Sequence, residues 1–510
     1  MKNNNLLTLA FLLICNVSFS QTQLTNIQFR TLSQKLTTIE KSQDLESLNN
    51  LLDNNVLVFL PDAPPIYSKE VVLDLFKYSW GKNKNNTEIK YEPTSIKKNN
   101  NTIYEEGMYQ YRDGNRGLIK MSYSIVGIEI NSGPSIKEIV YNNSKKEIQD
   151  LPKPTGIYKV GQSTHFYSKN ENRTRPIAFQ IWYPTKVDSE DNLPFQSKEV
   201  ALAITNFLGW PSFNNSFTRL MNSNAVKNVP IAPNKKFPVV IYNHGYGGAT
   251  PVYQTVFEEL ASHGYVVVSV GHQDESAFLI REDGSVIENS PQNEFYTKRE
   301  PELNNRTIGI EQSTILNSDD LNDLNKSYKK LVQLSPLHTE SVNLWALDTK
   351  NVIIELKKIN KHNLLLKGGF DFNNMGIFGH SVGGAVAGDF SSKETFKAGI
   401  NIDGFQFGNL INSKLKIPFL FISSNEEDNR YLRVLPFANA SEKTTYQAII
   451  KGFSHGSFSD LQLFTPNGND GIQLQRELIL GFFNKYLKKK NIKFQSVKNR
   501  FENLTLNKLK

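Results

Sequence analysis

The pentapeptide Gly379-His380-Ser381-Val382-Gly383 contains the residue types that most directly imply chemistry. It follows a short apolar segment, residues 375–378, and precedes a segment of small residues that begins at residue 384. A serine at a sharp turn between a strand and a helix is lifted out of the sheet edge toward the positive end of the helix. The glycines on either side leave room for strand and helix to approach. We therefore predict that Ser381 is a nucleophile.

A serine hydroxyl needs a base, and His455 is the only histidine that lies downstream of Ser381. It belongs to the segment Gly452-Phe453-Ser454-His455-Gly456, which follows the last predicted strand of a sheet. An imidazole in such a loop can reach back over the sheet edge, take a proton from the nucleophile and return it to a leaving group. We predict that His455 is this base.

Two places in the chain offer the acid that would orient the imidazole. Asp403 ends the predicted strand over residues 398–402 and is followed by a glycine, whereas Glu426 follows the next strand, residues 418–422. The second position is the commoner one for the acid of such a triad. Spacing and context nevertheless favour Asp403, and Glu426 stays as the alternative.

Acyl transfer also needs donors for the negative charge that develops on oxygen. The residue after the nucleophile, Val382, supplies one backbone N–H. The glycine-rich segment at residues 243–248 follows the predicted strand over residues 237–242 and can supply a second donor. Within that segment we predict that the N–H of Tyr246 is the donor.

The elements that must position these residues form an α/β pattern after residue 155. The predicted strands are short apolar runs, as expected for a mostly parallel sheet buried on both faces. They cover residues 177–183, 237–242, 265–270, 375–378, 398–402, 418–422 and 446–450, with helices at 252–263, 339–360 and 385–390. We predict a catalytic domain over residues 156–490 that carries an irregular, polar insertion at 281–337, able to act as a lid. A basic, solvated tail would follow at 491–510.

The first part of the chain has a different pattern. Residues 24–53 have helical periodicity, residues 56–60 form a strand, and a helix begins near Ser68. Alternating segments at 88–91, 102–112, 118–130 and 136–141 then predict antiparallel strands. Residues 52–65 and the following helix resemble the SnoaL-like, nuclear transport factor 2-like superfamily. The resemblance implies a small α+β cone over residues 21–147, joined by a linker at 148–155, and we favour an accessory role because no acid–base pair stands out.

Composition and the amino terminus bound the remaining possibilities. Of the 510 residues, 58 are Lys or Arg and 50 are Asp or Glu, and the net charge of +8 is spread along the chain, which does not favour nucleic-acid binding. The apolar run at residues 6–14 predicts a signal peptide over residues 1–20 with cleavage after Ser20, and therefore export to the periplasm or the medium. The single cysteine, Cys15, lies inside it. Lipid anchoring at Cys15 and an uncleaved membrane anchor stay as alternatives. One cysteine excludes disulfide and Cys-based zinc scaffolds, and we expect no metal or cofactor.

Several segments together resemble the platelet-activating factor acetylhydrolase group of α/β-hydrolases. The resemblance spans residues 156–486 and is carried by the segments 175–184, 242–247, 260–267, 271–274, 379–383, 402–404 and 454–455. It implies calcium-independent release of short or oxidised acyl chains from esters, phospholipids included. It also implies that the acid is Asp403 and that the oxyanion donors are Tyr246 and Val382.

These observations predict an exported serine hydrolase that acts on short or medium acyl esters through an acyl-enzyme. Its partners would be a small ester or lipid and, transiently, a lipid surface, but no nucleic acid. A serine peptidase of the same fold is one alternative. A non-catalytic binding protein on the same scaffold is another, although decayed sites usually lose at least one member of the catalytic set.

Overall fold

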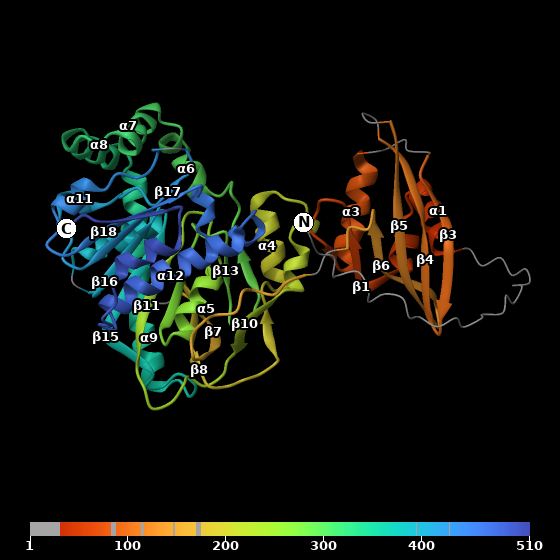
Figure 1. The fold of residues 1–510 in the computed structure, drawn as a ribbon, viewed down its shortest axis with the longest axis horizontal. Helices are drawn as coiled ribbons and strands as arrows, with labels where there is room; N and C mark the ends of the chain where they lie inside the picture. The colour runs from red at the N-terminus through yellow and green to blue at the C-terminus, as the bar shows by residue number, and fades with distance from the viewer. Residues whose placement is uncertain are drawn as a thin grey trace, which may run out of the picture.

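The computed structural model describes residues 31–82, 88–113, 117–145, 148–169, 175–393, 395–427 and 429–510. The predicted signal peptide and Cys15 lie outside these residues. The chain builds two separate large sheets, one of six strands and one of 11 strands (Figure 1). Within the described part of the chain, no helix is both long enough and apolar enough to cross a membrane.

The N-terminal sheet has the order β2-β1-β6-β5-β4-β3 and is packed against three helices (Figure 1). The helices are α1 (Leu32–Ser42), α2 (Leu45–Leu51) and α3 (Lys69–Lys82). The strands are β1 (Leu52–Phe59), β2 (Ile66–Tyr67), β3 (Lys90–Asn99), β4 (Thr102–Asp113), β5 (Gly117–Ile130) and β6 (Gly133–Tyr141). The helical pattern of residues 24–53 is interrupted at Gln43, which has a φ of +53°, and α2 then begins at the Asp44 cap. This domain has the α+β arrangement that the sequence predicts.

The larger sheet has the order β19-β18-β17-β16-β15-β11-β12-β8-β7-β10-β9. Six neighbouring strands run parallel: β18 (Thr445–Lys451), β17 (Phe419–Asn425), β16 (Ala398–Ile402), β15 (Phe370–His380), β11 (Phe237–Asn243) and β12 (Val266–Gly271). The antiparallel strands β8 (Ile177–Thr185) and β7 (Lys159–Tyr167) continue the sheet on one side. The short strands β10 (Asn222–Lys227) and β9 (Asn192–Pro194) complete that edge.

Helices cover both faces of this sheet. The core of one face includes α9 (Pro336–His362) and α10 (Val382–Ser391), and that of the other includes α5 (Gln254–Ser262) and α12 (Gly468–Tyr486). A mostly parallel sheet between two helical layers, with a nucleophile-type turn after β15, is the α/β-hydrolase fold. All six parallel strands end at one edge, which brings the residues that follow them together.

The insertion at residues 281–337 is not irregular, so this prediction was wrong. It contains α6 (Glu294–Leu303), α7 (Arg306–Asn317) and α8 (Leu321–Leu334), after the hairpin of β13 (Phe278–Ile280) and β14 (Val286–Glu288). Each helix begins at an Asn or Asp side chain that accepts backbone N–H groups. In α8 the buried residues Leu324, Tyr328 and Leu331 recur at helical spacing, so the signal was present in the sequence, but the polar composition of the segment outweighed it in the prediction.

The prediction of a solvated basic tail at residues 491–510 was also wrong. The segment forms the 3₁₀ helix η6 (Phe494–Arg500) and the strand β19 (Leu504–Lys508), which pairs antiparallel with β18 at the edge of the large sheet. Leu504 and Leu506 are buried, whereas Thr505 and Asn507 are exposed. This alternation is that of an edge strand with one face in the core.

Candidate active site

Ser381 stands at the sharp turn between β15 and α10. Its φ of +56° and ψ of −122° lie in a region that non-glycine residues rarely occupy. Its backbone N–H donates to the Ile402 carbonyl at 2.9 Å. A Cβ atom at Gly379 would lie 2.2 Å from the Gly383 carbonyl oxygen, and one at Gly383 would lie 2.0 Å from the Asn243 carbonyl oxygen. Glycines on both sides of the serine are therefore required by the close approach of three backbone segments.

The structure brings Asp403 and His455 together. Asp403 follows β16, and its Oδ2 accepts a hydrogen bond from His455 Nδ1 at 2.8 Å. Ser424 donates its N–H to Asp403 Oδ1 at 2.7 Å and its hydroxyl to Oδ2 at 2.8 Å. Burial raises the pKa of Asp403, but the hydrogen bonds from His455 and Ser424 outweigh burial, so the net shift of the pKa is downward. The carboxylate is thus kept charged next to the imidazole.

The alternative acid lies elsewhere. Glu426 is exposed on the surface after β17, and no hydrogen bond or ion pair joins it to His455 in the part of the chain that the structure describes. The imidazole of His455 is itself partly open, with 55% of its side chain exposed, whereas only 6% of the Asp403 side chain is exposed. Asp403 is therefore shielded from solvent, whereas His455 faces it.

His380, directly before the nucleophile, is a site residue to which the sequence assigned no role. Its Nε2 donates to the backbone carbonyl of His455 at 3.0 Å, and the two imidazole rings lie 4.4 Å apart. Burial, and then the nearby His455, lower the pKa of His380 to about 3, so this ring is neutral at ordinary pH. The signal in the sequence was only its place within the pentapeptide.

The predicted oxyanion loop, residues 243–248, lies against Ser381, the predicted nucleophile. A Cβ atom at Gly245 would be 3.0 Å from Cβ of Ser381. Gly247 donates its N–H to the Glu275 carbonyl and Gly248 donates to the Gly245 carbonyl, each at 3.0 Å. The N–H of Tyr246 makes no hydrogen bond with the described residues. Val382 is the first residue of α10, where backbone N–H groups have no partner within the helix.

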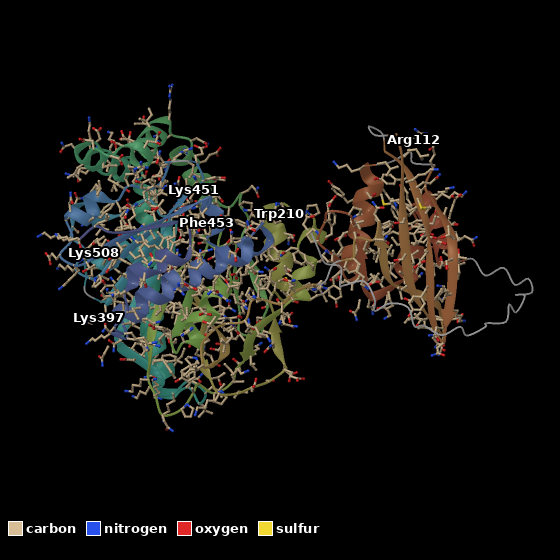
Figure 2. The ribbon with its side chains drawn as sticks, viewed as in Figure 1. Arg112, Trp210, Lys397, Lys451, Phe453 and Lys508 are labelled. Atoms are coloured by element: carbon tan, nitrogen blue, oxygen red, sulfur yellow. The ribbon has the colours of Figure 1, made fainter. Side chains whose placement is uncertain are left out.

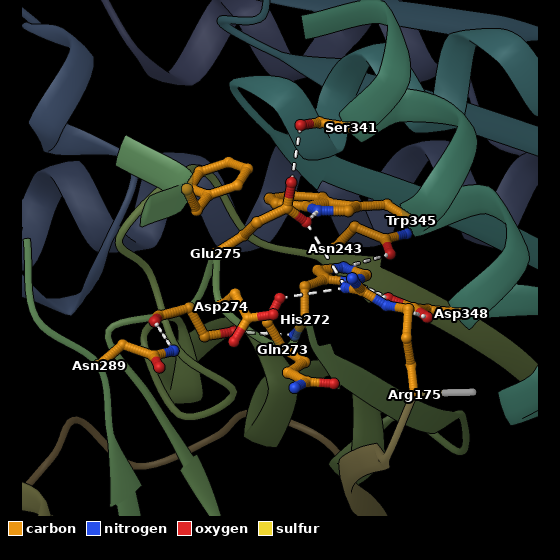
Figure 3. A network of polar contacts seen from close by, with 12 residues as sticks. Arg175, Asn243, His272, Gln273, Asp274, Glu275, Asn289, Ser341, Trp345 and Asp348 are labelled. Atoms are coloured by element: carbon orange, nitrogen blue, oxygen red, sulfur yellow. Dashed lines mark hydrogen bonds and ion pairs between the residues drawn. The ribbon is translucent and has the colours of Figure 1, made fainter. Parts of the chain in front are cut away.

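A buried polar network contacts this loop through Asn243 and Glu275 (Figure 3). The His272 ring lies with its nitrogens 3.0 Å from Asp348 Oδ2 and 3.1 Å from Asn243 Oδ1, and it stacks on Trp345 with ring centroids 3.9 Å apart. Arg175 forms ion pairs with Asp348 at 3.3 Å and Glu275 at 3.8 Å. His272 and Arg175 belong to segments that carry the family resemblance, and in the structure both lie in this buried network next to the loop.

Glu275 links this network to the oxyanion loop and was missed by the sequence analysis. Its carboxylate accepts hydrogen bonds from Trp345 Nε1 and, at 2.7 Å, from Ser341 Oγ (Figure 3). Its backbone carbonyl accepts the N–H of Gly247. Burial raises the pKa of Glu275 to about 7, even though two hydrogen bonds and two arginines act in the opposite direction. The backbone carbonyl of Glu275 is therefore bonded to the oxyanion loop, and its side chain is bonded to helix α9 through Ser341 and Trp345.

The described residues contain no group of three or more His, Cys, Asp and Glu side chains that could hold a metal ion. The site instead contains a buried, charged carboxylate that is hydrogen-bonded to an imidazole, close to the turn that carries Ser381. Such a pair can accept a proton from a hydroxyl group, because the carboxylate stabilises the imidazolium cation that results.

Comparisons with known proteins identify the family of the chain. A family model described as platelet-activating factor acetylhydrolase, isoform II, matches residues 143–472. Platelet-activating factor acetylhydrolase of Cavia porcellus is 27% identical over 363 residues, which cover 66% of this chain and 78% of the relative. The enzyme of Canis lupus familiaris is 24% identical over 360 residues, with 66% and 77% covered.

A solved structure, a ferulic acid esterase from Streptomyces cinnamoneus, covers 68% of this chain and 95% of its own, with 17% identity and a TM-score of 0.49. The likeness of the N-terminal domain to the SnoaL-like superfamily stays a prediction. The family match spans more than half of the chain and includes Ser381, Asp403 and His455. The chain belongs to the platelet-activating factor acetylhydrolase, isoform II, family and is an ester-bond hydrolase.

Proposed function

We propose that this protein is an exported serine esterase that releases short or medium acyl chains, including those of phospholipids, through an acyl-enzyme on Ser381. The observation that carries the proposal is the 2.8 Å bond between His455 and Asp403 beside the strained turn of Ser381. The names of the relatives support an ester substrate of the platelet-activating factor type. Export is supported by the predicted signal peptide at residues 1–20.

In the acylation step, Oγ of Ser381 attacks the carbonyl carbon of the ester while Nε2 of His455 takes the hydroxyl proton. Asp403 fixes the tautomer of the imidazole and stabilises its cation. The carbonyl oxygen becomes an oxyanion that accepts hydrogen bonds from the backbone N–H groups of Tyr246 and Val382. When the tetrahedral intermediate collapses, the bond to the alcohol oxygen breaks and His455 gives that oxygen the proton.

In the deacylation step, a water molecule enters as the second nucleophile. His455 takes one of its protons while its oxygen attacks the acyl carbon bound to Ser381. Collapse of this second intermediate returns the proton to Oγ and releases the carboxylic acid. The exposed side of His455 is suited to both steps, because alcohol and water exchange there while Asp403 stays covered.

The test is hydrolysis of p-nitrophenyl esters of increasing chain length by the full chain and by Ser381→Ala. We expect loss of hydrolysis and of labelling by a fluorophosphonate probe in the variant, because both need the Oγ atom. Ser392→Ala, which changes a serine just beyond α10, is the matched control and should retain both. Full activity in Ser381→Ala would refute the mechanism. Cleavage of amide but not ester substrates would favour a peptidase instead.

A further inference from the structure

Residues 195–221 form a segment between the two sheets, which we term the bridging segment. It contains α4 (Lys198–Leu208) and the 3₁₀ helices η1 (Ser212–Asn214) and η2 (Ser216–Arg219). Helix α4 lies on the side of the catalytic domain that faces the N-terminal domain (Figure 1). Trp210, directly after α4, is on this side and is 44% exposed (Figure 2).

The outer side of the bridging segment contacts one stripe of α3. Glu70, Asp74 and Tyr78 are spaced four residues apart, so they share one face of that helix. Glu70 pairs with Lys198 at 2.7 Å, Ser212 donates its hydroxyl to Asp74 at 2.8 Å, and Tyr78 meets the Phe213 ring edge-on at 5.6 Å.

A second set of contacts comes from the strand before α3. The backbone N–H of Tyr67 donates to Ser216 Oγ at 3.0 Å, and Arg219 donates to Ser68 Oγ at 3.2 Å. The N-terminal domain therefore holds α4, η1 and η2 through at least one contact each.

The inner side of the same segment covers the oxyanion loop. Gly247 has a φ of +66°, and a Cβ atom there would lie 2.8 Å from the ring of Phe207 in α4. Val200 and Ala203 of α4 share a buried cluster with Ala249, two residues beyond Gly247. A shift of α4 would therefore displace the loop that carries the Tyr246 N–H.

The inner side also contacts the segment that follows the His455 loop. Phe217 of η2 meets Phe464 edge-on at 5.2 Å, and Phe464 ends η5 (Asp460–Phe464), which follows the histidine closely in the chain. Asp460 in turn accepts the N–H groups of Gln254 at 2.6 Å and Thr255 at 3.2 Å, at the start of α5. The bridging segment thus touches the oxyanion loop directly and reaches the His455 loop through η5, which contacts the turn that begins at His455.

The contact between the domains is polar and incompletely packed. Glu70 and Tyr78 remain exposed, Tyr78 by 50%, and a cavity of about 370 Å³ lies between the Pro64-Pro65 turn, the linker, Phe217 and Phe464. Exposed ion pairs contribute little each, and interfaces of this kind allow domains to move. The contact can therefore be released without unfolding either domain.

We propose that the N-terminal domain is a positioning module: by holding the bridging segment it sets the oxyanion loop and the His455 loop, and thereby the acyl-chain selectivity of the enzyme. This inference rests on the proposed esterase function. Its physical basis is that one packed segment with two inner contacts transmits its position to both loops. Releasing its outer side should change how well the transition state of each ester is bound, while Ser381 itself stays reactive.

The test compares the full chain with the stripe variant Glu70→Lys, Asp74→Lys, Tyr78→Ala. These side chains face outward from α3, so we expect the N-terminal domain to keep its fold. Ser79→Lys, at an exposed position that the helical period puts on the face of α3 opposite Glu70, is the matched control. The measurements are kcat and KM for p-nitrophenyl acetate to decanoate, titration of active sites with a fluorophosphonate, and domain separation by small-angle X-ray scattering.

We expect the stripe variant to separate its domains, to titrate fully, and to change the ratio of kcat/KM between long and short esters by about tenfold. The control should keep the wild-type ratio. Phe217→Ala, which acts on the inner side without changing α3, should shift the ratio in the same direction. An unchanged ratio in the stripe variant would overturn the inference, even if Ser381→Ala is inactive. Activity in Ser381→Ala would instead overturn the proposed function.

Discussion

Two buried carboxyl groups, one in each domain, have pKa values that are shifted in opposite directions. Asp403 at the edge of the large sheet is 6% exposed and Glu40 in the N-terminal domain is 5% exposed, so both lose nearly all contact with water. The pKa of Asp403 is lowered, whereas burial raises the pKa of Glu40 to about 7. Equal burial therefore does not decide which of these groups carries a charge.

The difference lies in their partners. Asp403 accepts bonds from an imidazole, a backbone N–H and a serine hydroxyl, and the imidazole can carry a compensating positive charge. Among the described residues, Glu40 accepts hydrogen bonds from tyrosine hydroxyls alone, from Tyr91 at 2.7 Å and Tyr109 at 3.5 Å. Hydroxyl donors lower the pKa of Glu40 but do not offset burial. Asp403 is thus kept ionised, whereas Glu40 is mostly neutral below about pH 7.

The largest effect should come from removing the charge of Asp403. In Asp403→Asn we expect kcat to fall by about 10⁴-fold, because the imidazole loses both its orientation and the stabilisation of its cation. Asparagine tolerates the φ of +53° at this position, so the fold should persist. The measurement is ester hydrolysis with circular dichroism as the check on folding. Glu40→Gln should hydrolyse the same esters at the wild-type rate, and a similar loss there would erase the distinction between the two groups.

Glu40 should instead control the pH dependence of stability. Its folded pKa of about 7 lies above its ordinary value of 4.5, so the proton is bound more tightly in the folded chain. The stability from this group is complete below pH 4.5 and is lost as the pH rises through 7, by about 3 kcal/mol in all. Urea unfolding at pH 5 and pH 8 should show a smaller difference in Glu40→Gln than in the wild type. An equal difference would mean that Glu40 is already ionised in the fold.

His380 should have an intermediate effect that separates positioning from structure. His380→Phe removes the donor to the His455 carbonyl, and we expect kcat to fall by roughly tenfold. His380→Gln keeps an N–H donor and should recover most of the rate. Because His380 is neutral above a pKa of about 3, the pH profile of the Gln variant should match the wild type between pH 5 and pH 9. Equal losses in both variants would indicate a packing role alone.

The smallest effects concern the residues around the acid. Ser424→Ala removes one of two bonds from this residue to Asp403 and leaves the N–H, so we expect a loss of about threefold in kcat. Glu426→Gln, at the exposed alternative position, should have no effect on kcat. A larger loss in the Glu426 variant than in the Ser424 variant would reverse the assignment of the acid.

Much of the candidate site could be read from local pattern. The glycines around Ser381 and the apolar runs before Ser381 and Asp403 are short-range signals, and the structure places these residues at strand ends. The helices of the insertion and the edge strand β19 were missed for one reason. Both segments are mostly polar, and this composition outweighed the periods that their few buried residues do follow, with Leu324, Tyr328 and Leu331 at helical spacing and Leu504 and Leu506 alternating as in a strand.

The sequence by itself determined the strands and turns that carry the candidate nucleophile, acid and base, because the conformation of a turn and the burial of a short strand depend on neighbouring residues. Only the tertiary structure decided which acid meets His455, because that depends on how strands β16, β17 and β18 lie side by side. It also decided the place of His380 and the contact of α3 with the bridging segment. These pairings join residues far apart in the chain, and no local period encodes a distance across a sheet or between two domains.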